Sequence, residues 1–272
     1  MSKYDGAYTK PVLKWAGGKS QMLGQIVPRM PSEYNVYIEP FFGSGAVYFA
    51  VAPQQAIIAD SNPELINLYR VISTDVDALI DKLSTYTNTE DTFYAIRALD
   101  WESLSPLEAA ARMVYLNKTC FNGLYRVNKK GQFNTPFANN NRSTYCDAAE
   151  IRKAAILLRN AELICGDYHA VLMEKAREND FVFLDPPYVP VSKYSDFKRY
   201  TKEQFGEDDQ RRLAEDVYTL SERGCKVMLT NSNHPLVHEL YGRYRIEVFQ
   251  TRRMINKDGN NRTGEDVIVT TY

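Results

Sequence analysis

Short apolar runs of strand length alternate with helix-like segments in the first and last parts of the chain. The runs lie at residues 36–38, 56–59, 162–164, 181–184 and 226–229. Continuous apolar runs of this length are typical of strands buried on both faces of a parallel sheet. A glycine loop after the first run leads into the helix-like segment 46–51, and Asn62-Pro63-Glu64 opens a second helix. We therefore expect an α/β fold with a doubly wound, Rossmann-like sheet.

The middle of the chain has a different pattern. Residues 73–160 are helical and polar in pattern, interrupted by a glycine- and asparagine-rich stretch at 122–143. Strand–helix alternation then resumes and ends in a hairpin-like pair of segments, 244–251 and 266–271. The pattern predicts a core domain of residues 1–72 and 161–272, with residues 73–160 inserted as a mainly helical domain.

The composition narrows the class of protein. The 272 residues are 44% hydrophobic and 25% charged, and no apolar stretch approaches a membrane span or the core of a signal peptide. The four cysteines contain no Cys-x-x-Cys pair, which indicates neither a zinc knuckle nor a disulfide framework. His234 and His238 have the spacing of metal ligands, but Pro235 interrupts a regular helix start and no third ligand is in view. We expect a cytoplasmic protein with no metal and no membrane partner.

Charge is segregated along a chain whose net charge is −1. The stretch from Lys118 to Arg142 carries only basic charges, and a second basic group lies near the C-terminus, including Arg252 and Lys257. Acidic residues gather elsewhere, notably between Asp75 and Glu102. Such segregation gives one basic face, which suits a polyanion such as DNA. A solvated face without a partner is the alternative that charge alone leaves open.

The tetrapeptide Asp185-Pro186-Pro187-Tyr188 follows an apolar run, where a parallel strand would end. Ligands bind at this edge of an open α/β sheet. The tetrapeptide offers a carboxylate, a backbone carbonyl and an aromatic face, which together could hold a flat, amino-bearing base during alkylation of its exocyclic nitrogen. The competing interpretation is a proline-rich turn in which Asp185 is a turn residue.

A glycine loop and a carboxylate indicate a nucleoside cofactor. Gly43 and Gly45 lie between a strand and a helix, where glycine lets the backbone approach a ligand. Asp60 ends the next strand and could accept both hydroxyls of a ribose. Upstream, Trp15 could face a sulfonium group and Lys19 could pair with a carboxylate. This set suits S-adenosylmethionine, although the glycines could serve packing and Trp15 could be a core residue.

These motifs together resemble a known family. In chain order they are Lys14-Trp15-Ala16-Gly17-Gly18-Lys19, Glu39-Pro40-Phe41-Phe42-Gly43-Ser44-Gly45, Asp60, Phe121-Asn122-Gly123-Leu124-Tyr125-Arg126-Val127-Asn128 and Asp185-Pro186-Pro187-Tyr188. The series resembles that of the Dam-type (D12 class, alpha group) DNA adenine-N6 methyltransferases, from about Leu13 to Tyr272. The resemblance implies a class I S-adenosylmethionine-dependent methyltransferase sheet with a target-recognition domain at 73–160. It also implies methyl transfer to adenine N6 in double-stranded DNA, with S-adenosylhomocysteine as the product.

The resemblance assigns roles to individual residues. It places Trp15, Lys19, Asp60 and Asp185 against the cofactor, and Asp167 and Tyr168 in its adenine pocket. Asn122, Leu124, Arg126 and Asn128 belong to a hairpin near residues 118–142 that enters the DNA. By the same resemblance Arg126 reads a guanine edge, Leu124 wedges at the opened step and Lys14 reads guanine. Arg252 and Lys257 are candidates for phosphate contacts, and the similar hairpins of enzymes acting on GATC imply that site.

The expected mechanism follows from the chemistry of adenine. N6 is a poor nucleophile and is inaccessible in a stacked duplex, so the base must be flipped out. We expect Tyr188 to stack on it, while Asp185 and the Pro186 carbonyl accept the two N6 hydrogens. The alternatives are another adenine-containing DNA site, an RNA or protein amine as substrate, and a DNA-binding relative without catalysis. We expect a monomer or weak dimer, acting at the bacterial nucleoid or encoded by a phage.

Overall fold

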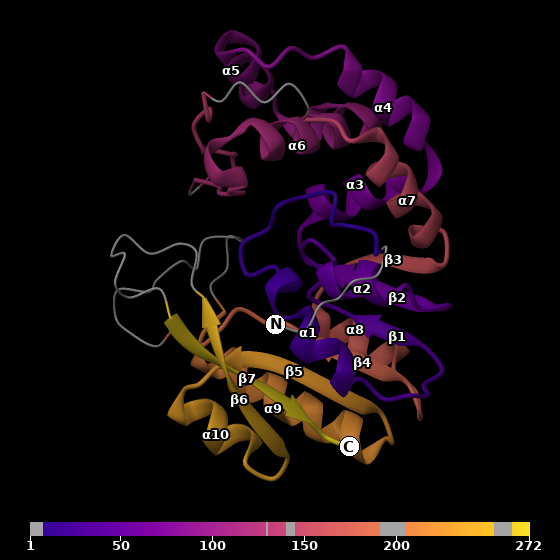
Figure 1. The fold of residues 1–272 in the computed structure, drawn as a ribbon, viewed down its shortest axis with the longest axis vertical. Coiled ribbons are helices and arrows are strands. Elements are labelled where there is room, and N and C mark those ends of the chain that lie inside the picture. The colour runs from indigo at the N-terminus through magenta and orange to yellow at the C-terminus, as the bar shows by residue number, and fades with distance from the viewer. Residues whose placement is uncertain (1–7, 129, 140–144, 191–204, 253–262) are drawn as a thin grey trace.

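The computed structural model describes residues 8–128, 130–139, 145–190, 205–252 and 263–272. Its centre is a seven-stranded sheet in the order β3-β2-β1-β4-β5-β7-β6 (Figure 1). The strands are β1 (Tyr37–Glu39), β2 (Ala56–Asp60), β3 (Ala161–Cys165), β4 (Phe181–Leu184), β5 (Lys226–Ser232), β6 (Arg245–Arg252) and β7 (Thr263–Thr270). The first five strands are parallel, and β7 pairs antiparallel with both β5 and β6. This is the expected Rossmann-like methyltransferase sheet, including the predicted C-terminal hairpin.

Both faces of the sheet are covered, so alternate strand residues enter different cores. In β4, Phe181 and Phe183 join one buried cluster, whereas Val182 and Leu184 join the other. The second cluster is closed by α8 (Tyr168–Lys175), α9 (Glu207–Glu222) and α10 (Pro235–Tyr241). Burial on both sides explains the continuous apolar run that predicted β4.

The first buried cluster extends from the sheet into the inserted region. The helices on this side are α1 (Leu23–Ile26), α2 (Ala46–Val51), α3 (Pro63–Thr74), α4 (Val76–Ser84), α5 (Glu90–Ala98), α6 (Pro106–Thr119) and α7 (Ala148–Leu158). Figure 1 shows α4–α7 gathered at the opposite end of the molecule from α9 and α10. The expectation of a polar helical region is wrong for α6, because nearly all of its residues from Ala109 to Thr119 are buried. Helix α6 is therefore the core of the insert.

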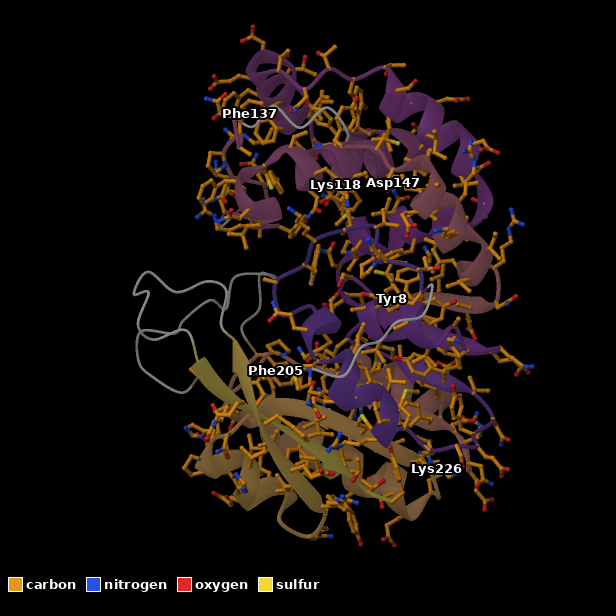
Figure 2. All side chains as sticks on the ribbon, in the orientation of Figure 1. Tyr8, Lys118, Phe137, Asp147, Phe205 and Lys226 are labelled. Carbon is orange, nitrogen blue, oxygen red and sulfur yellow. The ribbon has the colours of Figure 1, made fainter. Side chains whose placement is uncertain are left out.

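Residues 120–128 and 130–137 form an irregular antiparallel hairpin after α6. Isolated bridges join Cys120 to Phe137 and Val127 to Phe133. The Asn134 amide donates to the Arg126 carbonyl at 2.9 Å. Phe137, labelled in Figure 2, packs its ring 5.3 Å from that of Phe93 in α5, which attaches the hairpin to the helical region.

The histidine segment differs from the sequence expectation. Pro235 does not prevent a helix start but is the first residue of α10, where its missing N–H leaves no helical bond unmade. His234 caps this helix, because its side chain accepts a hydrogen bond from the Leu236 amide. Among the described residues, no helix is both long and apolar enough to cross a membrane.

Candidate active site

Asp185 directly follows β4 and pairs with Lys19 from the N-terminal segment. The Lys19 Nζ lies 2.7 Å from the Asp185 Oδ1, and only 7% of the lysine side chain is exposed. The Thr230 hydroxyl on β5 donates to the same Oδ1 at 2.8 Å. The Lys19 Nζ also lies 4.7 Å from the centre of the Tyr188 ring. The ends of β4 and β5 thus bring together a carboxylate, a cation and an aromatic ring.

Burial perturbs the acids of this cluster. It raises the pKa of Asp185, while the Lys19 charge and the hydrogen bonds from Lys19 and Thr230 oppose the rise. Burial also lowers the pKa of Lys19, but Asp185 and Tyr188 together more than compensate and leave it above its usual value. At the end of β1, burial raises the pKa of Glu39 to about 8, against the hydrogen bond that Tyr37 donates to it. In this largely buried site, the pair of Lys19 and Asp185 therefore stabilises the charged form of each partner.

Buried amides hold the loop after Asp185 in place. Asn231 and Ser232 on β5 form two hydrogen bonds with Val189: the Val189 amide donates to the Asn231 Oδ1, and the Ser232 hydroxyl donates to the Val189 carbonyl. Gln210 of α9 donates to the Pro187 carbonyl at 2.7 Å and accepts from Asn231. These side chains fix the backbone around Pro186, whose carbonyl receives no hydrogen bond from the part of the chain that the structure describes.

The glycine loop and Asp60 form one unit beside this cluster. Gly43 and Gly45 both have left-handed backbones, with φ of +50° and +66°, which favours glycine. The Gly43 amide donates to the Asp60 Oδ2 and the Asn62 amide to the Asp60 Oδ1, each at 2.9 Å. A carboxylate oxygen has a second lone pair, so Asp60 can still accept hydroxyl groups.

Trp15 covers the glycine loop. A Cβ at Gly43 would lie 2.8 Å from the Trp15 Cδ1, so a side chain there would displace the indole. The other neighbour of Trp15 is Tyr125, whose ring stacks on it with centres 4.9 Å apart and planes 26° apart. Trp15 is therefore partly packed and partly exposed beside the loop.

Three aromatic rings pack together at the start of α8. Tyr168 packs against Phe41 at 4.8 Å between ring centres and against Phe205 at 5.9 Å. Figure 2 labels Phe205 beside the sheet. The Asp167 side chain caps α8 by accepting from the Ala170 amide and is exposed. The start of α8 therefore places the exposed carboxylate of Asp167 next to a cluster of aromatic rings.

Lys14 and the hairpin lie side by side, although they are far apart in the chain. The buried side chain of Asn117 accepts from the Lys14 amide and donates to the carbonyls of Lys14 and Gly123. A Cβ at Gly123 would lie 2.5 Å from the Lys14 Cδ, so only glycine allows this approach. The structure therefore brings the two predicted guanine-reading regions together on one surface.

Within the hairpin, the predicted DNA contacts have different surroundings. Arg126 is exposed, and its Nε donates to the Asn134 Oδ1 at 2.7 Å. Asn128 bonds within its own turn, accepting from the amides of Lys130 and Gln132, so its Oδ1 is already used. Asn122 is exposed with a φ of +57°, and the Leu124 side chain is half-buried.

Two predicted DNA contacts cannot be placed. Lys257 lies outside the described residues, and Arg252 ends β6 without a described side chain.

Several residues of the site were not predicted from the sequence. Thr230, Asn117 and Tyr125 make contacts between distant segments, which no local pattern reveals. Phe121 could have been noticed: its ring is 55% exposed beside Asn122, and a large apolar side chain at the start of a basic hairpin is a usable signal.

The sequence of the chain is similar to those of known DNA methyltransferases. A family model described as "D12 class N6 adenine-specific DNA methyltransferase" matches residues 15–255. The type II methyltransferase M.MjaIII of Methanocaldococcus jannaschii is 39% identical, covering 93% of this chain and 95% of its own. The type II methyltransferase M1.LlaDCHI of Lactococcus lactis subsp. cremoris is 38% identical, with coverages of 97% and 95%. The DNA adenine methylase of Escherichia coli K12 is 33% identical, with coverages of 96% and 94%.

Proposed function

The chain belongs to the D12 class of N6 adenine-specific DNA methyltransferases, and from this premise we propose that it methylates adenine N6 in GATC with S-adenosylmethionine as donor. Its reaction class, site-specific adenine methylation of DNA, follows from the family. The observation that carries the proposal is the cluster of Lys19, Asp185 and Tyr188 at the end of β4, beside a glycine loop and next to a basic hairpin.

The residues present fit the cofactor. Its sulfonium supplies an electrophilic methyl group. Asp60 would accept the ribose hydroxyls, because each of its oxygens keeps a lone pair and it is bonded to a loop with glycines at 43 and 45. Tyr168 and Phe41 would hold the adenine of the cofactor, and Asp167 would accept its amino group. Trp15 would present its indole to the positive charge.

Lys19 has a different partner from the one expected. The expectation that it binds the cofactor carboxylate stays a prediction, since in the structure its amino group pairs with Asp185.

Asp185 and its loop would act on the target adenine. Lys19 and Thr230 both engage the Oδ1, which leaves the Oδ2 of Asp185 to accept one N6 hydrogen. The Pro186 carbonyl would accept the other, held in place by the buried bonds around Val189 and Pro187. These acceptors stabilise positive charge that develops on N6. The adenine would stack on the Tyr188 face that Lys19 does not cover, a contact worth about 1–3 kcal/mol.

Residues 73–160 would form the target-recognition domain, and the hairpin would read the DNA. Asn134 orients the Arg126 guanidinium, which suits bidentate contact with a guanine edge. Lys14 lies against Gly123 and would contact the same site from the other side. Leu124 and the exposed ring of Phe121 would occupy the step opened by base flipping. Asn122 would contact the backbone, as would Asn128, Arg252 and Lys257.

Mass spectrometry of methylated adenine tests this function. Purified protein and S-adenosylmethionine are incubated with duplexes that contain either GATC or a scrambled site, and an Asp185→Ala variant serves as the control. Methylation confined to GATC and absent from the control is the expected result. Methylation of a different DNA sequence would support adenine methylation as the reaction but contradict GATC as the recognition site. Methylation of RNA or a protein amine, but not of DNA, would overturn the substrate.

A further inference from the structure

Tyr125 belongs to the hairpin but contacts the cofactor side of the molecule. Its side chain is 6% exposed, and its ring stacks on Trp15 at 4.9 Å between centres. Trp15 in turn rests on Gly43 of the glycine loop, where a Cβ would lie 2.8 Å away. The next residue, Arg126, points to the exposed surface. Adjacent residues of one segment therefore contact Trp15 of the proposed cofactor pocket and the exposed surface proposed to bind DNA.

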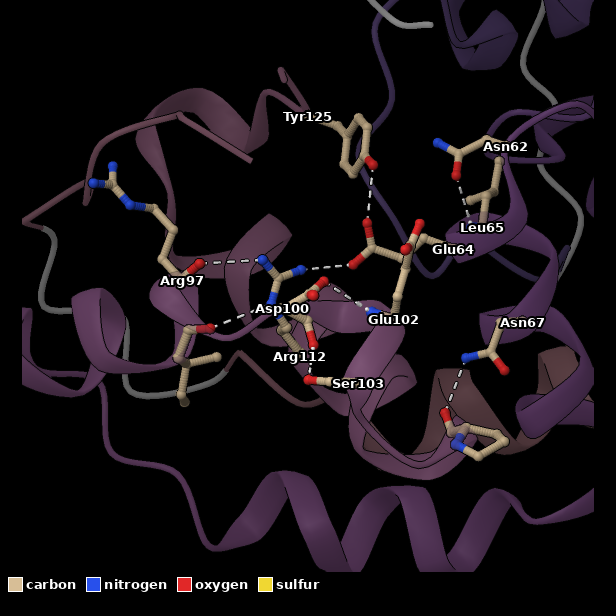
Figure 3. A network of polar contacts seen from close by, with 12 residues as sticks. Asn62, Glu64, Leu65, Asn67, Arg97, Asp100, Glu102, Ser103, Arg112 and Tyr125 are labelled. Carbon is tan, nitrogen blue, oxygen red and sulfur yellow. Dashed lines mark hydrogen bonds and ion pairs between the residues drawn. The ribbon is translucent and has the colours of Figure 1, made fainter. Parts of the chain in front are cut away.

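The Tyr125 hydroxyl is anchored in a buried polar network (Figure 3). It donates to the Glu64 Oε2 at 2.9 Å, and the Glu64 Oε1 pairs with the Arg112 Nη1 at 2.7 Å. Glu64 is on α3, two residues after Asn62, whose backbone amide donates to Asp60. The network thus fixes Tyr125 relative to the helix that starts beside the proposed ribose acceptor.

The same network also reaches the second strand of the hairpin, through Arg97 and Thr135. Arg112 donates to the carbonyls of Ile96 and Arg97, each at 3.2 Å. The Arg97 side chain donates to the Thr135 carbonyl, and the Thr135 hydroxyl donates to the Leu124 carbonyl at 2.7 Å. Both sides of the hairpin are therefore tied to one buried ion pair.

We propose that Tyr125 is a positioning residue shared by the cofactor pocket and the DNA-reading hairpin. Its ring stacks on Trp15, the residue that would border the cofactor, and its hydroxyl holds residues 121–128 in register with that pocket through Glu64 and Arg112. The inference rests on the proposed function, which assigns the cofactor to Trp15 and DNA to the hairpin. Because both ligands use the same ordered contact, binding of either one favours binding of the other.

The first test measures cofactor-product affinity without DNA. The chain has two tryptophans, so a Trp101→Phe background leaves Trp15 as the only indole and its fluorescence reports S-adenosylhomocysteine binding. In this background Tyr125→Leu is expected to weaken binding about five- to tenfold, the scale of one lost aromatic pair. Tyr125→Phe keeps the ring and is expected to change the affinity less than about twofold. Arg126→Gln is expected to leave it unchanged and to weaken DNA binding instead.

A matched control separates positioning from general damage. Tyr145 lies in the same helical region, and its hydroxyl bonds to the Leu83 and Tyr86 carbonyls. Tyr145 packs on Tyr115 and not on Trp15. Tyr145→Leu is expected to lower the thermal unfolding midpoint as Tyr125→Leu does, but to leave S-adenosylhomocysteine affinity at the wild-type value. Equal losses of affinity in the two variants would overturn the positioning role.

The second test measures the coupling itself. Dissociation constants for a GATC duplex are compared with and without saturating S-adenosylhomocysteine. We expect the wild type to bind DNA about tenfold more tightly with the product bound, and Tyr125→Phe to retain no more than about a twofold effect. Coupling that survives in Tyr125→Phe would overturn the inference. A wild type that binds neither ligand would overturn the proposed function as well, so the two failures are distinguishable.

Discussion

Lys19 and Asp185 form an ion pair in which each charge depends on the other. Lys19→Met removes the cation that opposes the burial-driven rise in the Asp185 pKa. The ionised carboxylate is the form that accepts an N6 hydrogen, so we expect the acid limb of the pH–rate profile to move upward by about one to three pH units. Single-turnover methylation at saturating cofactor checks this, with Lys153→Met on an exposed helix surface as control. An acid limb that stays in place would show that Asp185 is not the titrating group.

The buried Glu39 makes the free energy of unfolding of the protein depend on pH. Burial raises its pKa from 4.5 to about 8, so the folded protein holds a proton that the unfolded chain releases above about pH 4.5. This contribution to stability is complete below that pH and is lost as the pH rises through 8. Glu39→Gln mimics the protonated form, so its stability relative to the wild type should increase between pH 5 and 9 by about 1–4 kcal/mol. Urea unfolding at several pH values measures it, and parallel curves would contradict the expectation.

At the scale of elements, α3 and α6 are joined by the buried pair of Glu64 and Arg112. Their side chains are both 4% exposed. Arg112→Met leaves an uncompensated carboxylate, and we expect a loss of about 3–5 kcal/mol in the free energy of unfolding. The loss should shrink at low pH, because Glu64 can then take up a proton. The double variant Arg112→Met/Glu64→Gln should recover part of the stability, whereas losses that simply add would show that the pair does not interact.

Local patterns predicted the elements but not the contacts between them. The bounds of α2 and β4 follow from the apolar pattern, and the structure confirms them. Helix α6 was misjudged as polar, and the burial of its Arg112 is explained by Glu64, 48 residues earlier, and by the carbonyls of Ile96 and Arg97. The contacts of Asn117 with Lys14 and of Tyr125 with Trp15 join segments about a hundred residues apart, and no sequence spacing encodes them. The family motifs marked the site without showing how it is supported.

At the scale of the whole molecule, the net charge is only −1, whereas the surface around the hairpin is basic. Lys14 and Arg126 are exposed on neighbouring segments, and Lys130 is exposed in the turn. Arg126 is oriented by Asn134, whereas none of the side-chain hydrogen bonds within the described residues uses the Lys130 amino group. A fixed guanidinium suits base reading, and an unconstrained ammonium suits phosphate.

This difference predicts two separable effects on DNA binding. Lys130→Gln should weaken binding to GATC and scrambled duplexes by the same factor, and should reduce the slope of log affinity against log salt by about 1. Arg126→Gln should cost about 1–3 kcal/mol on GATC alone and so reduce the ratio of specific to nonspecific affinity. Fluorescence anisotropy over a salt series measures both, because each duplex gives an affinity and a slope. If Arg126→Gln lowered both affinities equally, Arg126 would be a phosphate contact, and the specificity would have to come from Lys14 or from the shape of the DNA.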